Sequence, residues 1–242
     1  MKKISNIKYY IFLFTLILVF SSCEKDNYDA PDATLQGTIT TSKGAPYQAE
    51  QGQGSIKLRL EELSWSENPL PLYLNIHQDG TYINRKIFAA KYRITPIEGA
   101  FYPFAEGDMK TVDVKGTTTV DFTVTPYLDV EWVADPTTDA EGNIISSFKF
   151  TRNASPSGAA MPALKDYQMF ISSTQYVGNN NFDGSIVAGV VGVDNSKEGQ
   201  PLTITTKAPI KRKGTYFVRI GVRVNDSFQK YNYTDIKTVE VK

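Results

Sequence analysis

The chain has 242 residues, with 26 Lys and Arg against 26 Asp and Glu, one histidine and one cysteine. A single cysteine excludes both an intramolecular disulfide framework and a multi-thiolate metal site. No basic stripe or block of positive charge points to a nucleic-acid partner.

The first 22 residues have the order of a secretory signal peptide. Three lysines precede an apolar run at 9–20, and Ser21 and Ser22 follow it. The run is shorter than the roughly 20 residues that a membrane-spanning helix needs. We therefore expect residues 1–22 to be removed on export, which makes a membrane-spanning anchor the weaker interpretation.

Cys23 stands directly after these serines, and the segment resembles a bacterial lipobox. In a lipobox the cysteine sulfur receives a diacylglycerol and the freed amine a further acyl chain. Phe20 departs from that pattern, which usually has an aliphatic residue at this position. Each buried methylene contributes about 0.8 kcal/mol, so two or three chains would hold the protein on a membrane. Lipidation of Cys23 is the prediction, and an unmodified thiol at a cleavage junction is the alternative.

The mature chain is predicted to begin with a tether and to continue into a first β-sandwich. Residues 23–33 form the tether, because 24–33 are polar, acidic and poor in apolar residues. From Thr34 to Pro126, short runs alternate apolar and polar positions with a period of two, and no window of eleven residues carries a helical stripe. The predicted strands include 56–61, 72–77, 81–83, 112–114 and 120–124.

A second β-sandwich is predicted over 127–242, because Pro126 suits a domain junction. In 216–224 the even-numbered positions are apolar, whereas the odd-numbered positions include Arg219 and Arg223. Trp132 has the parity of a core residue. The other predicted strands are 128–132, 148–150, 167–172, 186–193 and 236–241.

Several motifs resemble known families. The segments 37–46, 79–82 and 89–94 resemble a carboxypeptidase-regulatory or transthyretin-like sandwich, and 213–220 resembles the penultimate strand of a fibronectin type III domain. Taken together, 27–35, 78–81, 98–101 and 122–128 resemble an uncharacterised two-domain lipoprotein family, a domain of unknown function, from gut anaerobes.

That resemblance covers the mature chain and implies two tandem β-sandwich domains. It also implies a lipid-anchored protein on the outer membrane that faces the cell exterior, beside glycan-uptake systems of the starch-utilisation type. In such lipoproteins an acidic stretch after the lipid-bearing cysteine is associated with export to the outer face. The family supplies no catalytic residues.

The residues that catalysis or metal binding would need are scarce. His77 is the only histidine and has the solvent-side parity of its strand, and no Gly-x-Ser-x-Gly motif presents a nucleophile. Asp135, Asp139 and Glu141 lie in one loop, but their spacing is not that of an EF-hand, and a solvated hairpin is the simpler interpretation. We therefore expect that the protein is not an enzyme, binds no metal ion and uses no cofactor. A hydrolase would need a carboxylate pair in a cleft.

Glycan binding is the functional hypothesis with physical content, because pyranose rings present an apolar face that stacks on exposed aromatic rings. The main alternative is a structural or adhesive scaffold that docks to an outer-membrane transporter complex. Each aromatic residue could instead pack against the protein's own core or a protein partner. The candidate glycan-binding residues are Trp65, Tyr73, Tyr102, Tyr176 and Tyr231.

Overall fold

Strands connected by tight turns make up most of the computed structural model, which describes residues 30–52, 54–64 and 66–242. The predicted signal peptide, Cys23 and Trp65 lie outside these residues. Two 3-10 helices, η1 (Glu106–Asp108) and η2 (Asn195–Lys197), interrupt the strands. In the described ranges, no helix is long and apolar enough to cross a membrane.

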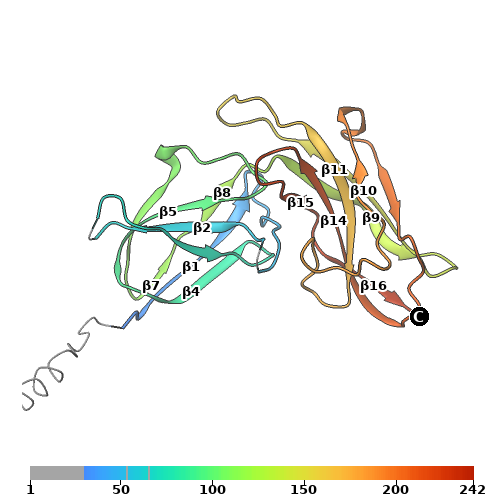
Figure 1. Ribbon diagram of the computed structural model, residues 1–242, viewed down its shortest axis with the longest axis horizontal. Helices are drawn as coiled ribbons and strands as arrows, with labels where there is room; N and C mark the ends of the chain where they lie inside the picture. Colours follow the sequence, from blue (N-terminus) through green and yellow to red (C-terminus); the bar gives the residue numbers. More distant parts are fainter. Residues whose placement is uncertain (1–29, 53, 65) are drawn as a thin grey trace, which may run out of the picture. The chain divides into compact units, whose positions relative to one another are not determined.

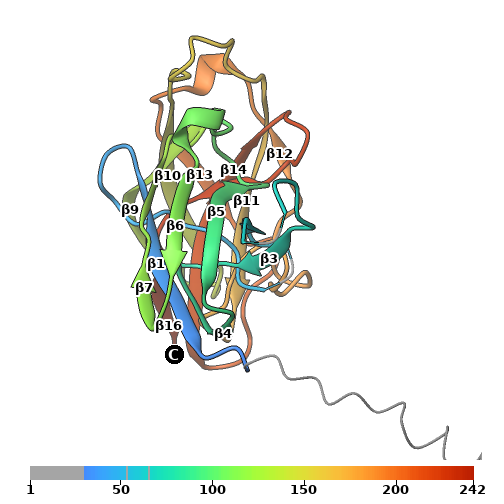
Figure 2. The ribbon, with the colours of Figure 1, turned by 90° about the vertical axis from the view of Figure 1, so that its left-hand side faces the viewer.

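The N-terminal domain has two sheets (Figure 1). In the first sheet, β1 (Ala33–Thr41) pairs antiparallel with β4 (Thr81–Ile87) and parallel with β7 (Thr117–Thr119) and β8 (Phe122–Val124). The second sheet has the order β3-β2-β5-β6, and Figure 2 shows β5 next to β6. Its strands are β2 (Lys57–Glu62), β3 (Leu72–Asn75), β5 (Ala90–Ile97) and β6 (Lys110–Val114).

The period-two pattern places one face of each sheet in a common core. Leu35, Ile39, Leu58, Leu60 and Ile94 are at most 1% exposed and belong to one cluster. Burying each such side chain stabilises the fold by about 1.5–3 kcal/mol. The core therefore accounts for the sandwich that the alternation predicts.

The C-terminal domain also has two sheets, one of order β13-β10-β9 and one of order β12-β11-β14-β15, with β16 pairing to β14. Its core includes Phe148, Phe150, Met169, Val218 and Ile220, each 0% exposed. The two domains make the chain an all-β protein of β-sandwich type. The strands are β9 (Leu128–Thr138), β10 (Ile144–Arg152), β11 (Leu164–Ser172), β12 (Val191–Gly192), β13 (Leu202–Thr205), β14 (Gly214–Val224), β15 (Tyr231–Tyr233) and β16 (Lys237–Val241).

Residues 186–193 differ from the strand predicted there. Only Val191–Gly192 forms a strand, because the chain turns at Asp183, whose carboxylate accepts hydrogen bonds from Ser185. Ile186 and Val187 are buried in the core from this loop, which explains their apolar character without a strand. Strands β7, β13 and β15 occur where none was predicted.

Trp132 lies partly buried against the core of the C-terminal domain rather than inside it. Its indole Nε1 donates a hydrogen bond to the Asp235 carbonyl oxygen at 3.0 Å. The apolar parity of Trp132 therefore reflects a ring that packs on one side and keeps its polar edge bonded.

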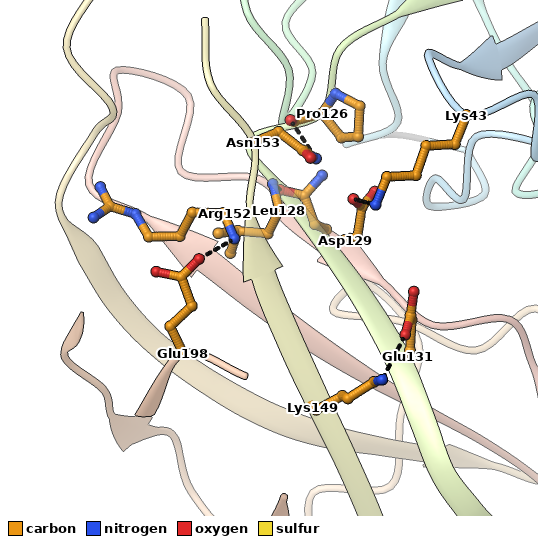
Figure 3. A network of polar contacts seen from close by, with 10 residues as sticks. Lys43, Pro126, Leu128, Asp129, Glu131, Lys149, Arg152, Asn153 and Glu198 are labelled. Atoms are coloured by element: carbon orange, nitrogen blue, oxygen red, sulfur yellow. Dashed lines mark hydrogen bonds and ion pairs between the residues drawn. The ribbon is translucent and has the colours of Figure 1, made fainter. Parts of the chain in front are cut away.

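Polar contacts hold the segment that leads from one sandwich into the other (Figure 3). Asn153 Nδ2 donates to the Pro126 carbonyl oxygen at 3.2 Å, and the Lys43 ammonium lies 2.5 Å from an Asp129 carboxylate oxygen. Residues Asp32–Lys242 form one compact unit. The two sandwiches therefore contact each other through specific polar interactions.

Candidate functional site

A fully buried arginine lies at the interface between the sandwiches. Arg219 is 0% exposed on β14, and its Nη1 donates to the carbonyl oxygens of Ala49 at 2.8 Å and Val177 at 3.2 Å. Its Nη2 donates to the Thr234 carbonyl oxygen at 3.3 Å. The guanidinium carbon lies 4.0 Å from the centroid of the Tyr233 ring. The face of β14 that carries its odd-numbered residues is predicted to be polar by the alternation, but it is covered at Arg219.

Glu50 and Tyr233 form a second buried contact beside Arg219. The Tyr233 hydroxyl donates to the Glu50 carboxylate, and both residues are at most 6% exposed. Burial raises the pKa of Glu50, and it raises the pKa of Tyr233 well above its usual value. Burial also lowers the pKa of Arg219 to about 10, so the guanidinium stays charged at neutral pH. The cluster thus combines a cation, an acid and a phenol away from bulk water.

A hollow of about 330 Å³ opens next to this cluster, which we name the Tyr176 hollow. The Tyr176 side chain is 48% exposed there. Backbone and side-chain polar groups surround the ring, and the space suits a small polar ligand. The lining residues are Glu50, Gln51, Tyr176, Val177, Gly178, Asn180 and Asn181.

The loop that carries Tyr176 is held by hydrogen bonds. Asn181 Nδ2 donates to the Tyr176 carbonyl oxygen at 2.6 Å and to Thr174 Oγ1 at 2.9 Å. Gln78 of the N-terminal domain donates through Nε2 to the Gln175 carbonyl oxygen at 2.9 Å. The exposed ring therefore stands on a fixed support, which lowers the entropy that binding would cost.

A second hollow, of about 630 Å³, shares Asn181 with the first as a lining residue. Its lining is mostly polar and includes Asp183, Arg212 and Lys213. Together the two hollows form a polar surface with one exposed aromatic ring. Such a surface can stack a sugar ring and bond its hydroxyl groups.

The structure places the predicted glycan-binding residues in different environments. Tyr176 is exposed at the Tyr176 hollow, and Tyr73 is 51% exposed on β3 with the Lys57 ammonium 5.7 Å from its ring centroid. The structure does not bring these two residues together in one hollow. Trp65 lies outside the described residues.

For two of these candidates the expected exposure is wrong, because Tyr102 and Tyr231 are buried, at 7% and 3% exposure. The Tyr102 hydroxyl donates to the Asn153 carbonyl oxygen at 2.8 Å. Tyr231 packs edge-on against Phe170 with 5.2 Å between ring centroids. Phe170 packs on the Tyr231 ring, whereas Tyr102 borders a hollow of about 690 Å³ together with Phe104.

The polar residues considered for catalysis or calcium have local roles. His77 is exposed, with Nδ1 3.0 Å from Thr81 Oγ1. The Asp139 carboxylate accepts hydrogen bonds from the backbone N–H groups of Glu141 and Asn143, which closes a hairpin. Within the described ranges, no three His, Cys, Asp or Glu residues gather as metal ligands would.

The sequence assigns no role to Glu50 and predicts Arg219 on the polar face of its strand. Glu50 and Tyr233 are separated by 183 residues, and Arg219 and Ala49 by 170. Local alternation carries no signal for contacts between residues so far apart. The one hint in the sequence is that Arg219 stands between Phe217 and Gly221 on its face of the strand.

Two sandwiches with an exposed aromatic ring beside polar hollows define an all-β protein with a candidate ligand-binding surface. The chain belongs to the DUF3823 family. Residues 33–125 match the model described as "Protein of unknown function (DUF3823) N-terminal domain". Residues 133–238 match the model described as "Domain of unknown function (DUF3823_C)". No curated protein sequence matches the chain.

Solved structures share the fold. A DUF3823 family protein from Bacteroides uniformis has a TM-score of 0.78 and 24% identity, and the match covers 88% of this chain and 100% of that one. One from Parabacteroides merdae has a TM-score of 0.67 and 21% identity, with the same coverages. A "putative carbohydrate binding protein" from Bacteroides uniformis has a TM-score of 0.68 and 23% identity, covering 87% and 99%. At these identities the likeness establishes the fold alone.

Proposed function

We propose that the protein is a non-catalytic, surface-exposed outer-membrane lipoprotein that assists polysaccharide capture and uptake by binding a glycan at the Tyr176 hollow. The observation that carries this proposal is the Tyr176 ring, 48% exposed beside a hollow lined by carboxylate and amide side chains. Pyranose rings stack on such rings through their C–H faces, and the polar groups bond the hydroxyls. The description of one structural relative as a carbohydrate binding protein supports this ligand class.

The binding test compares two exposed tyrosines. We expect Tyr176→Ala to weaken retention by the bound polysaccharide in affinity electrophoresis about tenfold, from roughly 1.4 kcal/mol of lost stacking. Tyr73→Ala tests the other exposed candidate: binding at the hollow alone leaves its retention unchanged, because Tyr73 lies on β3 and outside the hollow, and weaker retention would indicate stacking at Tyr73 as well. Equal retention of the wild type and Tyr176→Ala would remove this hollow from the proposal.

Trp65 stays a candidate for a second stacking position. We expect Trp65→Ala to weaken polysaccharide retention without unfolding the protein, as measured by the same electrophoresis and by circular dichroism. Unchanged mobility of that variant would exclude Trp65.

The lipid anchor on Cys23 forms the membrane part of the proposal. We expect Cys23→Ser to release the protein from the membrane fraction, because the variant lacks the thiol that carries the diacylglycerol. A variant that stays with the membranes after a salt wash would contradict lipid anchoring.

The second candidate function is a scaffold that docks to components of an outer-membrane glycan transporter. It is favoured by apolar side chains at the start of β3, where Leu72 is 50% exposed, and just before it, where Leu70 is 95% exposed. An exposed apolar edge of this kind is typical of partner binding. A Leu70→Ser, Leu72→Ser variant that loses transporter components on co-purification, yet retains polysaccharide, would support the scaffold.

A further inference from the structure

Cations gather on the segment between β13 and β14. Lys207, Lys211, Arg212 and Lys213 are all exposed. Arg212 and Lys213 line the second hollow, and Lys207 Nζ donates to the Gly184 carbonyl oxygen at 2.7 Å, near the opposite rim. The fold therefore concentrates positive charge at the hollow that adjoins Tyr176, although the whole chain is neutral.

Little negative charge opposes these cations. Asp183 is the one carboxylate among the described residues that line the hollow, and its Oδ1 accepts from Ser185 N at 2.9 Å and Ser185 Oγ at 2.5 Å. Glu240 lies on the neighbouring strand and accepts a hydrogen bond from Thr215. Among the described ion pairs, none involves Arg212 or Lys213. Their charged groups are available to a ligand.

Asn181 lines both hollows. A polysaccharide with one sugar ring on Tyr176 that extends past Asn181 would reach the hollow lined by Arg212 and Lys213. A guanidinium binds a planar carboxylate or a sulfate through paired N–H donors, and a lysine adds a point charge. Neutral sugars offer hydroxyl groups to these donors but no opposite charge.

We propose that the second hollow is an anion subsite and that the glycan is acidic, with a carboxylate or sulfate on the sugar next to the one that stacks on Tyr176. This inference rests on the proposed glycan-binding function and names the class of its ligand. The contribution of the charge is electrostatic, so affinity falls as salt is raised.

The experiment uses the full chain with Cys23→Ser and measures affinity electrophoresis on polygalacturonate, alginate and chondroitin sulfate. The first two carry carboxylates and the third also carries sulfates, so the panel distinguishes the two anions. Methyl-esterified polygalacturonate is the matched neutral polymer, because esterification removes the charge and keeps the sugar backbone. We expect at least one acidic polymer to bind ten times or more tightly than the neutral one.

The variant Arg212→Gln, Lys213→Gln should lose at least tenfold in affinity for the acidic polymer and most of the salt dependence. Its matched control is Arg85→Gln, Lys86→Gln, which removes two exposed charges from β4 and should change little. Equal losses of affinity in both variants would overturn the anion subsite. Duplex DNA serves as a polyanion without the sugar ring of the glycan, and wild-type protein that retains DNA as well as the acidic polymer would also overturn it.

The outcomes separate this inference from the function on which it rests. If acidic and neutral polymers bind equally and Tyr176→Ala abolishes both, the glycan-binding function stands and the anion subsite is wrong. If no polymer, acidic or neutral, is retained, both are wrong.

Discussion

Replacing Arg219 with methionine tests how strongly the interface stabilises the protein. The side chain donates three hydrogen bonds to backbone carbonyl oxygens, of which Ala49 belongs to the N-terminal domain and Val177 and Thr234 to the C-terminal domain. Methionine keeps an unbranched, flexible side chain that can pack on Tyr233, but it donates nothing. The substitution therefore removes donors while it preserves much of the contact.

The magnitude follows from what remains buried. A hydrogen bond from a charged donor contributes about 1.5–3 kcal/mol net, and a buried acceptor left without a partner costs about 1–3 kcal/mol. Removal of a desolvated charge offsets part of that loss. For three carbonyl groups we expect a net decrease of about 3 kcal/mol in the free energy of unfolding.

Urea unfolding followed by fluorescence and circular dichroism measures this decrease. We expect the wild type to unfold in one transition and Arg219→Met to unfold earlier, with the two domains separating into distinct transitions. Arg85→Met is the control, because Arg85 is exposed on β4, and such surface changes stay within about 0.5 kcal/mol. A single Arg219→Met transition within 0.5 kcal/mol of that control would refute the reasoning.

Two further predictions concern the same region. Burial raises the pKa of Glu50 above the usual 4.5, so its contribution to stability is full below about pH 4.5 and declines as the pH rises through the raised value. Stability of Glu50→Gln relative to wild type should therefore increase between pH 4.5 and 8 in urea titrations; a constant difference would contradict this. Gly221→Ala should cost about 1–3 kcal/mol, because the new Cβ would lie 2.8 Å from the Tyr231 ring and 2.9 Å from Phe170. Thermal unfolding should show the loss, whereas Gly192→Ala, with no atom within 4 Å of its Cβ, should show little.

Both sandwiches could be predicted from alternation because each strand buries one face. Leu58 and Leu60 in β2, and Phe148 and Phe150 in β10, are buried two residues apart while their neighbours are not. A period of two is the direct consequence of side chains that point to opposite faces of a strand. Local sequence therefore determines where these strands lie and which side faces the core.

The same logic fails where both faces of a strand are covered. Tyr231, Asn232 and Tyr233 in β15 are all buried, so no alternation marks the strand. In the sequence alone, Tyr231 therefore cannot be distinguished from an exposed aromatic residue near the chain end. Its burial depends on Phe170 and Arg223, which lie in other strands.

The covered face also connects the interface to the candidate site. Phe170, Val177, Tyr231 and Tyr233 form a cluster separate from both sandwich cores, on the side of the sheet where Arg219 lies. Val177 directly follows the exposed Tyr176, and its carbonyl oxygen accepts from Arg219. The ring proposed to bind sugar therefore lies next to a C-terminal cluster that Arg219 links to Ala49 of the N-terminal domain. Because binding to a preorganised ring costs less entropy, an interface that comes apart should weaken glycan binding even when Tyr176 itself is unchanged.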